Sequence, residues 1–181
     1  MKIGIVQFAS IEGEVKRNCE HFEHEVKKYS KNGLDLLCFP ELCISGYKFE
    51  SGKQMDEKAF VSELAQRYKQ PILAGVQSVC QGKYYDAVCL WDEAGDIVGE
   101  YKKIHLWASE NDYFARGNEL VAVSFRGWKI GMLICADLGF AEISTPLALE
   151  KEADLIIYPS AWGYGWEELF CGCAKTRAAE N

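Results

Sequence analysis

The order of the first three predicted elements constrains the fold more than any other feature of this chain. Residues 2–8 form a short apolar run, residues 14–31 an amphipathic pattern and residues 34–39 a second apolar run. The apolar face of the middle segment recurs at helical spacing and consists of Val15, Cys19, Phe22, Val26 and Tyr29. A strand, a helix and a strand in succession predict a βαβ unit, whose strands are usually parallel.

Downstream of residue 39, helical patterns alternate with hairpin patterns. Further helices are predicted at 55–68, 142–151 and 167–180. Further strands are predicted at 71–79, 84–91, 96–102, 120–125, 128–134 and 154–158. The segment 103–118 is polar and is predicted to be a loop. This mixture predicts an α/β fold in which helices cover a sheet core, within a single domain over residues 1–181.

Composition excludes several classes of partner. The 181 residues are 49% hydrophobic and carry a net charge of -7, which argues against nucleic acid and anionic membranes as partners. No apolar run is long enough to span a membrane, and the first strand is too short for a secretory signal, so we expect a cytoplasmic protein. The 8 cysteines are scattered through apolar patterns, which in this context favours reduced thiols over a disulfide framework.

Three predicted strands end at residues whose side chains could be chemically reactive. The apolar run 128–134 stops at Cys135, where a sharp backbone turn would present a nucleophile beside outward-facing N–H groups. Glu41 follows the strand at 34–39, and Lys103 follows the strand at 96–102. Taken singly, Cys135 could instead be a buried core cysteine, and Glu41 and Lys103 could instead be surface charges. Because ligands gather at strand ends in α/β sheets, the three together form a candidate site.

Three segments resemble the motifs of the carbon–nitrogen hydrolase (nitrilase) superfamily. They are Phe39-Pro40-Glu41-Leu42 with Ser45-Gly46-Tyr47, Tyr101-Lys102-Lys103-Ile104-His105-Leu106, and Ile134-Cys135-Ala136-Asp137-Leu138-Gly139-Phe140 with Glu142. Weaker echoes are Gln7, Tyr113-Phe114 before Gly117, Tyr158-Pro159-Ser160-Ala161-Trp162 and Arg177-Ala178-Ala179-Glu180-Asn181. The resemblance implies a four-layer α-β-β-α sandwich, commonly dimerised, that acts on a small molecule without a cofactor or a metal.

The resemblance also implies roles for individual residues. Glu41, Lys103 and Cys135 match the family's Glu-Lys-Cys set, and Glu110 best matches a second glutamate that orients the lysine or the substrate. A loop charge is the alternative for Glu110. We expect a thiolate to attack an amide carbon, while a Glu41 whose pKa burial raises toward neutrality takes the thiol proton. Lys103 and the Ala136 N–H would stabilise the oxyanion.

Substrate-binding candidates lie in two aromatic segments and beside the cysteine. Tyr113, Trp162 and Ala136 are the three residues that we expect to contact substrate. Trp162 belongs to a segment with Tyr164 and Trp166 that suits either a pocket wall or a dimer interface.

Two departures from the family pattern bear on function. Ala136-Asp137 stands where nitrile-hydrolysing members generally carry Trp-Glu, which favours an amidase or carbamoylase branch and a small linear amide or N-carbamoyl substrate. Family domains continue past the segment that ends here at Asn181, so we expect the C-terminal part of the sandwich to be absent. A catalytically inactive remnant or binding module of the same fold is therefore an alternative.

A thiol-redox or metal-binding protein is a third hypothesis. Its only motivation is the cysteine count. Separately, His21 with His24 and Cys171 with Cys173 could each be called a metal half-site. Neither half-site has a second pair at ligand spacing nearby. We therefore do not expect a metal site.

Overall fold

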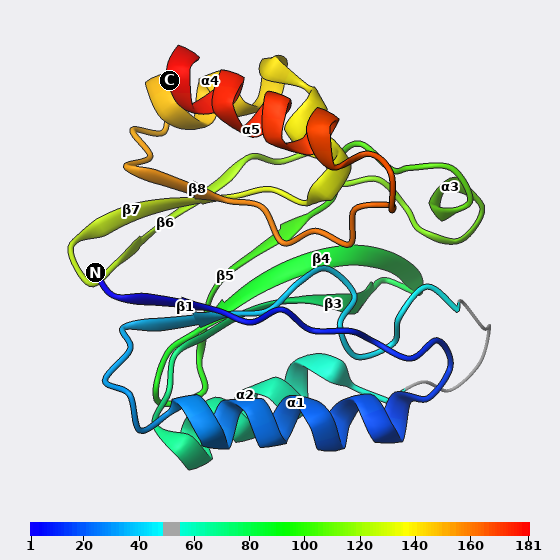
Figure 1. The fold of residues 1–181 in the computed structure, drawn as a ribbon, viewed down its shortest axis with the longest axis vertical. Helices are drawn as coiled ribbons and strands as arrows, with labels where there is room; N and C mark the ends of the chain where they lie inside the picture. The colour runs from blue at the N-terminus through cyan, green and yellow to red at the C-terminus, as the bar shows by residue number, and fades with distance from the viewer. Residues whose placement is uncertain (49–54) are drawn as a thin grey trace.

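The computed structural model describes residues 1–48 and 55–181, and it arranges them in four layers (Figure 1). Two helices cover the outer face of a five-stranded sheet, a three-stranded sheet lies against the inner face of the first, and two further helices cover its outer side. The four helices are α1 (Val15–Tyr29), α2 (Glu57–Tyr68), α4 (Ala141–Leu149) and α5 (Glu167–Glu180). The expected α-β-β-α sandwich is therefore confirmed.

The larger sheet contains the predicted βαβ unit. Its strands, in spatial order, are β1 (Ile3–Ile5), β2 (Leu36–Cys38), β3 (Ile72–Cys80), β4 (Lys83–Trp91) and β5 (Ile97–Lys102). β1, β2 and β3 are parallel, whereas β4 is antiparallel to both β3 and β5. β5 consequently runs in the same direction as β2, so the carboxyl ends of β2 and β5 lie toward the same end of the sheet.

The smaller sheet carries the nucleophile candidate. Its strands are β6 (Val121–Phe125), β7 (Trp128–Met132) and β8 (Leu155–Ile157). β6 and β7 form the predicted antiparallel hairpin, and β8 pairs parallel to β7. Figure 1 shows β8 beneath α4 and α5.

Strand alternation divides the interior into two cores. Successive side chains of a strand point to opposite faces, so Leu37 packs toward α1 and α2, while Leu36 and Cys38 pack toward the smaller sheet. On β4, Cys89 belongs to the helix-side core and Leu90 to the core between the sheets. The polar site described below lies at one end of these cores.

Two local structures differ from the expectation. The segment 103–118 contains a short helix, α3 (Glu110–Tyr113), because Glu110 accepts a hydrogen bond from the N–H of Trp107 and closes the first turn. β7 ends at Met132, and a 3-10 helix begins at Cys135.

Among the described residues, no helix is both long and apolar enough to cross a membrane.

Candidate active site

Lys103 is the centre of the site. Its side chain is fully buried, and its Nζ lies 2.5 Å from Glu41 Oε1, 2.8 Å from Glu110 Oε2 and 3.2 Å from Asp86 Oδ2. The backbone is fixed on both sides, because Lys103 N donates to the Asp86 carbonyl and the Lys103 carbonyl accepts from Gly117 N. Burial lowers the pKa of Lys103, but the three carboxylates outweigh burial and raise it above its ordinary value. The side chain is therefore a permanent buried cation.

Close backbone packing positions Glu41 against β3. The carbonyl of Pro40 accepts a hydrogen bond from Gly75 N, and a Cβ at Gly75 would overlap the Cα of Glu41. Leu42 has a φ of 43°, a left-handed conformation that is unusual for a branched residue. Strain of this kind persists only where the surrounding structure over-determines the backbone, so the Glu41 segment is held tightly.

The carboxylate of Glu41 is 2% exposed and well supplied with donors. Oε1 accepts from Lys103, and Oε2 accepts from Ala161 N at 2.9 Å. Burial raises the pKa of Glu41, but the charge of Lys103 and the hydrogen bonds outweigh it, so the pKa lies below its ordinary value. The expectation that burial would move this pKa toward neutrality is wrong, because it neglected the ammonium beside the carboxylate.

Cys135 lies where the chain turns out of the strand. It has a φ of 42°, and its N–H donates to the Pro159 carbonyl at 3.0 Å, which ties the turn to the segment after β8. The side chain is 8% exposed. Burial raises the pKa of the thiol and the hydrogen-bonded Glu41 carboxylate raises it further, against smaller opposing effects of Lys103 and the Ala161 N–H. The resting nucleophile candidate is a neutral thiol next to an anionic carboxylate.

Of the other predicted site residues, Glu110 contacts Lys103 directly, whereas Ala136 and Tyr113 have other surroundings. Glu110 belongs to it, since both of its carboxylate oxygens accept from Lys103 Nζ. The N–H of Ala136 stands in the first turn of the 3-10 helix, where no intrahelical acceptor precedes it. Tyr113 instead stacks on Tyr84 and accepts a hydrogen bond from Gln77.

Trp162 is half-buried in a cleft of about 700 Å³ whose walls come from both sheets. Its ring packs edge-on against Phe170, and its Nε1 donates to the carbonyl of Trp166. Pro40 and Ala161 line the cleft, and Ala161 N donates to Glu41 Oε2, but Glu41 itself is not part of the cleft wall. Tyr164 and Trp166 themselves are largely exposed.

Asp86 is the site residue that the sequence reasoning missed. It lies on β4, is fully buried, and approaches Lys103 Nζ from the sheet. The available signal was one acidic residue inside an otherwise uncharged strand pattern at 84–91. Oxygens of Glu41, Asp86 and Glu110 lie within 4.8 Å of one another, a spacing that would suit a metal ion, but the Lys103 ammonium is the cation among them.

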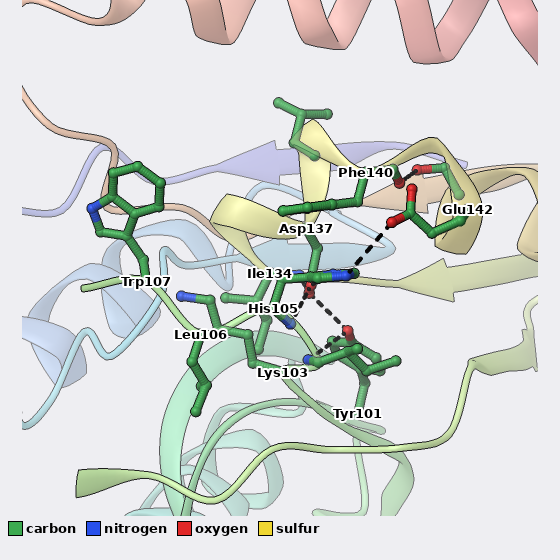
Figure 2. Close-up of polar contacts among 12 residues, drawn as sticks. Tyr101, Lys103, His105, Leu106, Trp107, Ile134, Asp137, Phe140 and Glu142 are labelled. Carbon is green, nitrogen blue, oxygen red and sulfur yellow. Dashed lines mark hydrogen bonds and ion pairs between the residues drawn. The ribbon is translucent and has the colours of Figure 1, made fainter. Parts of the chain in front are cut away.

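A further buried carboxylate, outside the Lys103 cluster, joins the segments that carry Lys103 and Cys135 (Figure 2). Asp137 Oδ2 accepts from the Tyr101 hydroxyl at 2.7 Å and from Ile134 N at 3.0 Å. Its Oδ1 lies 3.0 Å from both the backbone N and the Nδ1 of His105. The His105 ring stacks on Phe140, as Figure 2 also shows. Asp137 therefore connects the turn of the cysteine to both sides of the lysine.

Comparison with solved structures identifies the class of fold. An amidase from Nesterenkonia sp., in a variant with acrylamide added at its active-site cysteine, superimposes with a TM-score of 0.92. The match covers 100% of this chain and 75% of the amidase, at 22% sequence identity. The fold is thus that of the nitrilase-superfamily amidases.

Sequence comparison identifies the family. The carbon–nitrogen hydrolase model matches residues 2–181, and the chain is 33% identical to an (R)-stereoselective amidase of Pseudomonas sp., covering 100% of the chain and 68% of that protein. An omega-amidase of Escherichia coli is 28% identical, with coverage of 100% and 71%. This chain belongs to the carbon–nitrogen hydrolase family, and it is a hydrolase of amide-type C–N bonds.

Proposed function

We propose that this chain hydrolyses the C–N bond of a small linear amide or N-carbamoyl compound through a thioester at Cys135, with release of ammonia. The single observation that carries the proposal is the convergence of Glu41 and Lys103 on the Cys135 thiol from distant parts of the chain. The names of the relatives support the same chemistry, since they include a stereoselective amidase and an omega-amidase. The cysteine adduct in the Nesterenkonia amidase is a further parallel.

In the proposed acylation step, the Cys135 sulfur attacks the amide carbon while the thiol proton passes to Glu41. The oxyanion that forms is stabilised by the charge of Lys103 and by the N–H of Ala136, an effect of about 3 kcal/mol for a well-placed donor. Collapse of the intermediate breaks the C–N bond, and Glu41 returns its proton to the leaving nitrogen. Because the thiol is neutral at rest, proton transfer accompanies attack rather than preceding it.

In the proposed deacylation step, water attacks the thioester and gives a proton to Glu41. The second intermediate breaks its C–S bond, and the sulfur recovers the proton from Glu41. Glu110 accepts hydrogen bonds from Lys103 Nζ through both of its oxygens, so its proposed role is to orient the ammonium. No step requires a cofactor.

The test is ammonia release from a panel of short aliphatic amides and N-carbamoyl amino acids. We expect Cys135→Ala to abolish release and wild-type protein to show an acyl adduct on the Cys135 peptide by mass spectrometry. Cys171→Ala, which removes an exposed thiol on α5, is the matched control and is expected to behave as wild type. Undiminished activity of Cys135→Ala would refute the nucleophile assignment.

Substrate contacts, assembly and location are further parts of the proposal. Trp162 is proposed to contact the substrate, since it follows Ala161, whose N–H donates to Glu41 Oε2. Tyr113, whose hydroxyl accepts a hydrogen bond from Gln77, stays a candidate substrate contact. Tyr164, which is 97% exposed, and Trp166 form an apolar surface that suits a homodimer interface. Light scattering tests the dimer, and the proposed compartment is the cytoplasm.

A further inference from the structure

The cluster around Lys103 holds more acid than base. Three carboxyl groups, those of Glu41, Asp86 and Glu110, surround one ammonium, and all four side chains are almost completely buried. If every group were ionised, two negative charges would lack a cation. An uncompensated buried charge costs several kcal/mol, and a buried carboxyl group usually avoids that cost by keeping its proton.

The distribution of donors shows which group keeps the proton. A lysine ammonium has three N–H donors, and those of Lys103 serve one oxygen of Glu41 and both oxygens of Glu110. Glu41 has an additional donor in Ala161 N, and Glu110 has one in Trp107 N. Within residues 1–48 and 55–181, no donor hydrogen-bonds to either oxygen of Asp86.

We propose that Asp86 is a positioning residue that stays protonated at neutral pH and donates its O–H to Glu41. The neutral acid reduces the excess negative charge of the cluster and holds the Glu41 carboxylate in place between Lys103 and Cys135. Asp86 keeps its proton throughout the cycle and touches no substrate. This inference rests on the proposed function, because it assigns Asp86 a task in aligning the base of that reaction.

The electrostatics agree with this assignment. Burial raises the pKa of Asp86 and the neighbouring Glu41 charge raises it further, against the opposing effect of Lys103, and the result lies well above the ordinary value. The pKa of Glu41 moves in the opposite direction. Two adjacent carboxyl groups whose pKa values are shifted in opposite directions share one proton, which resides on the group with fewer donors.

Infrared difference spectroscopy tests the proton directly. We expect wild-type protein at pH 8.5 to show a carboxylic acid C=O band that is absent from Asp86→Asn. Glu57→Gln is the control for a buried acid outside the cluster, because Glu57, whose pKa burial raises to about 7, is ionised at this pH and contributes no band. Persistence of the band in Asp86→Asn, or its absence from wild type, would overturn the inference.

Kinetics test the positioning role separately. Asparagine preserves shape, neutrality and a donor toward Glu41, so Asp86→Asn is expected to retain most of kcat. Asp86→Ala is expected to lower kcat about tenfold to a hundredfold with little change in KM, the equivalent of one hydrogen bond to a charged group. If Asp86→Asn is as inactive as Glu41→Gln, the neutral-donor role is wrong.

The two readouts separate the two proposals. A band that Asp86→Asn removes from a protein inactive on every amide would leave the protonation assignment intact and refute the proposed function. Normal ammonia release by the wild-type protein, together with a band that Asp86→Asn leaves unchanged, would support the proposed function and refute the protonation assignment.

Discussion

Asp137 and the carboxylates around Lys103 belong to one buried region, but their hydrogen-bond donors are distributed in opposite ways. Asp137 has four N–H or O–H groups around its two oxygens, which come from two backbone amides, the Tyr101 hydroxyl and the His105 ring. The Lys103 cluster has three carboxyl groups that compete for one ammonium. Both arrangements are buried, and only the second is short of donors.

This difference separates a structural carboxylate from a chemical one. A carboxylate whose acceptor sites are filled from two segments of the chain fixes those segments relative to one another. A carboxylate in a donor-poor, cation-centred cluster has protonation states that lie close in free energy. Asp137 thus holds the frame, and the cluster supplies the Glu41 carboxylate that accepts and returns the proton in the proposed amide hydrolysis.

The largest expected effect comes from removing the shared cation. Lys103→Met leaves three buried acids without an ammonium, so the free energy of unfolding is expected to fall by about 3–5 kcal/mol at pH 8. The loss should shrink at pH 5, because the folded-state carboxyl pKa values rise and protonation then relieves the repulsion. Urea unfolding at both pH values measures this.

Lys58→Met is the matched control for that experiment. Lys58 pairs with Glu100 at 3.3 Å in a partly exposed position. Such pairs contribute about 0–1 kcal/mol. A loss for Lys103→Met that is small and equal at the two pH values would show that the cluster does not depend on its cation.

The next effect concerns the frame. Asp137→Ala leaves the Tyr101 hydroxyl and the N–H groups of Ile134 and His105 without an acceptor, which is expected to cost about 2–4 kcal/mol of unfolding free energy. Tyr101→Phe deletes one of these donors and should cost about 1 kcal/mol. Thermal and urea unfolding measure both. Equal losses for the two variants would contradict the claim that Asp137 is the hub.

The smallest effect concerns Glu57, a buried carboxyl group that belongs neither to the Lys103 cluster nor to the Asp137 contacts. Glu57 accepts from Gln77 N at 2.9 Å, and burial raises its pKa from 4.5 to about 7. The folded state therefore binds the proton more tightly than the unfolded state, and stability falls as pH rises from 4.5 through 7.

Glu57→Gln should abolish that pH dependence. The variant is expected to exceed wild type by about 2–3 kcal/mol in unfolding free energy at pH 8 and to match it at pH 4.5. Chemical denaturation at the two pH values measures the difference. A variant that is less stable than wild type at pH 8 would contradict the raised pKa of Glu57.

Local sequence patterns were sufficient for most of the fold. The apolar alternation and the helical spacing predicted each main strand and helix, because those patterns reflect which side of an element faces a core. They did not predict α3, whose single turn depends on the contact between Glu110 and the backbone of Trp107. Such a short helix has no periodicity to detect.

The sequence by itself determined the residue types that end the strands, among them Glu41, Lys103 and Cys135, and through their motifs the family. Only the tertiary structure decided which charges meet. Asp86 joins the cluster because β4 pairs with β5 in a register that places it beside Lys103. The direction of the Glu41 pKa follows from that meeting, since a pKa depends on the neighbours that folding brings within a few ångströms.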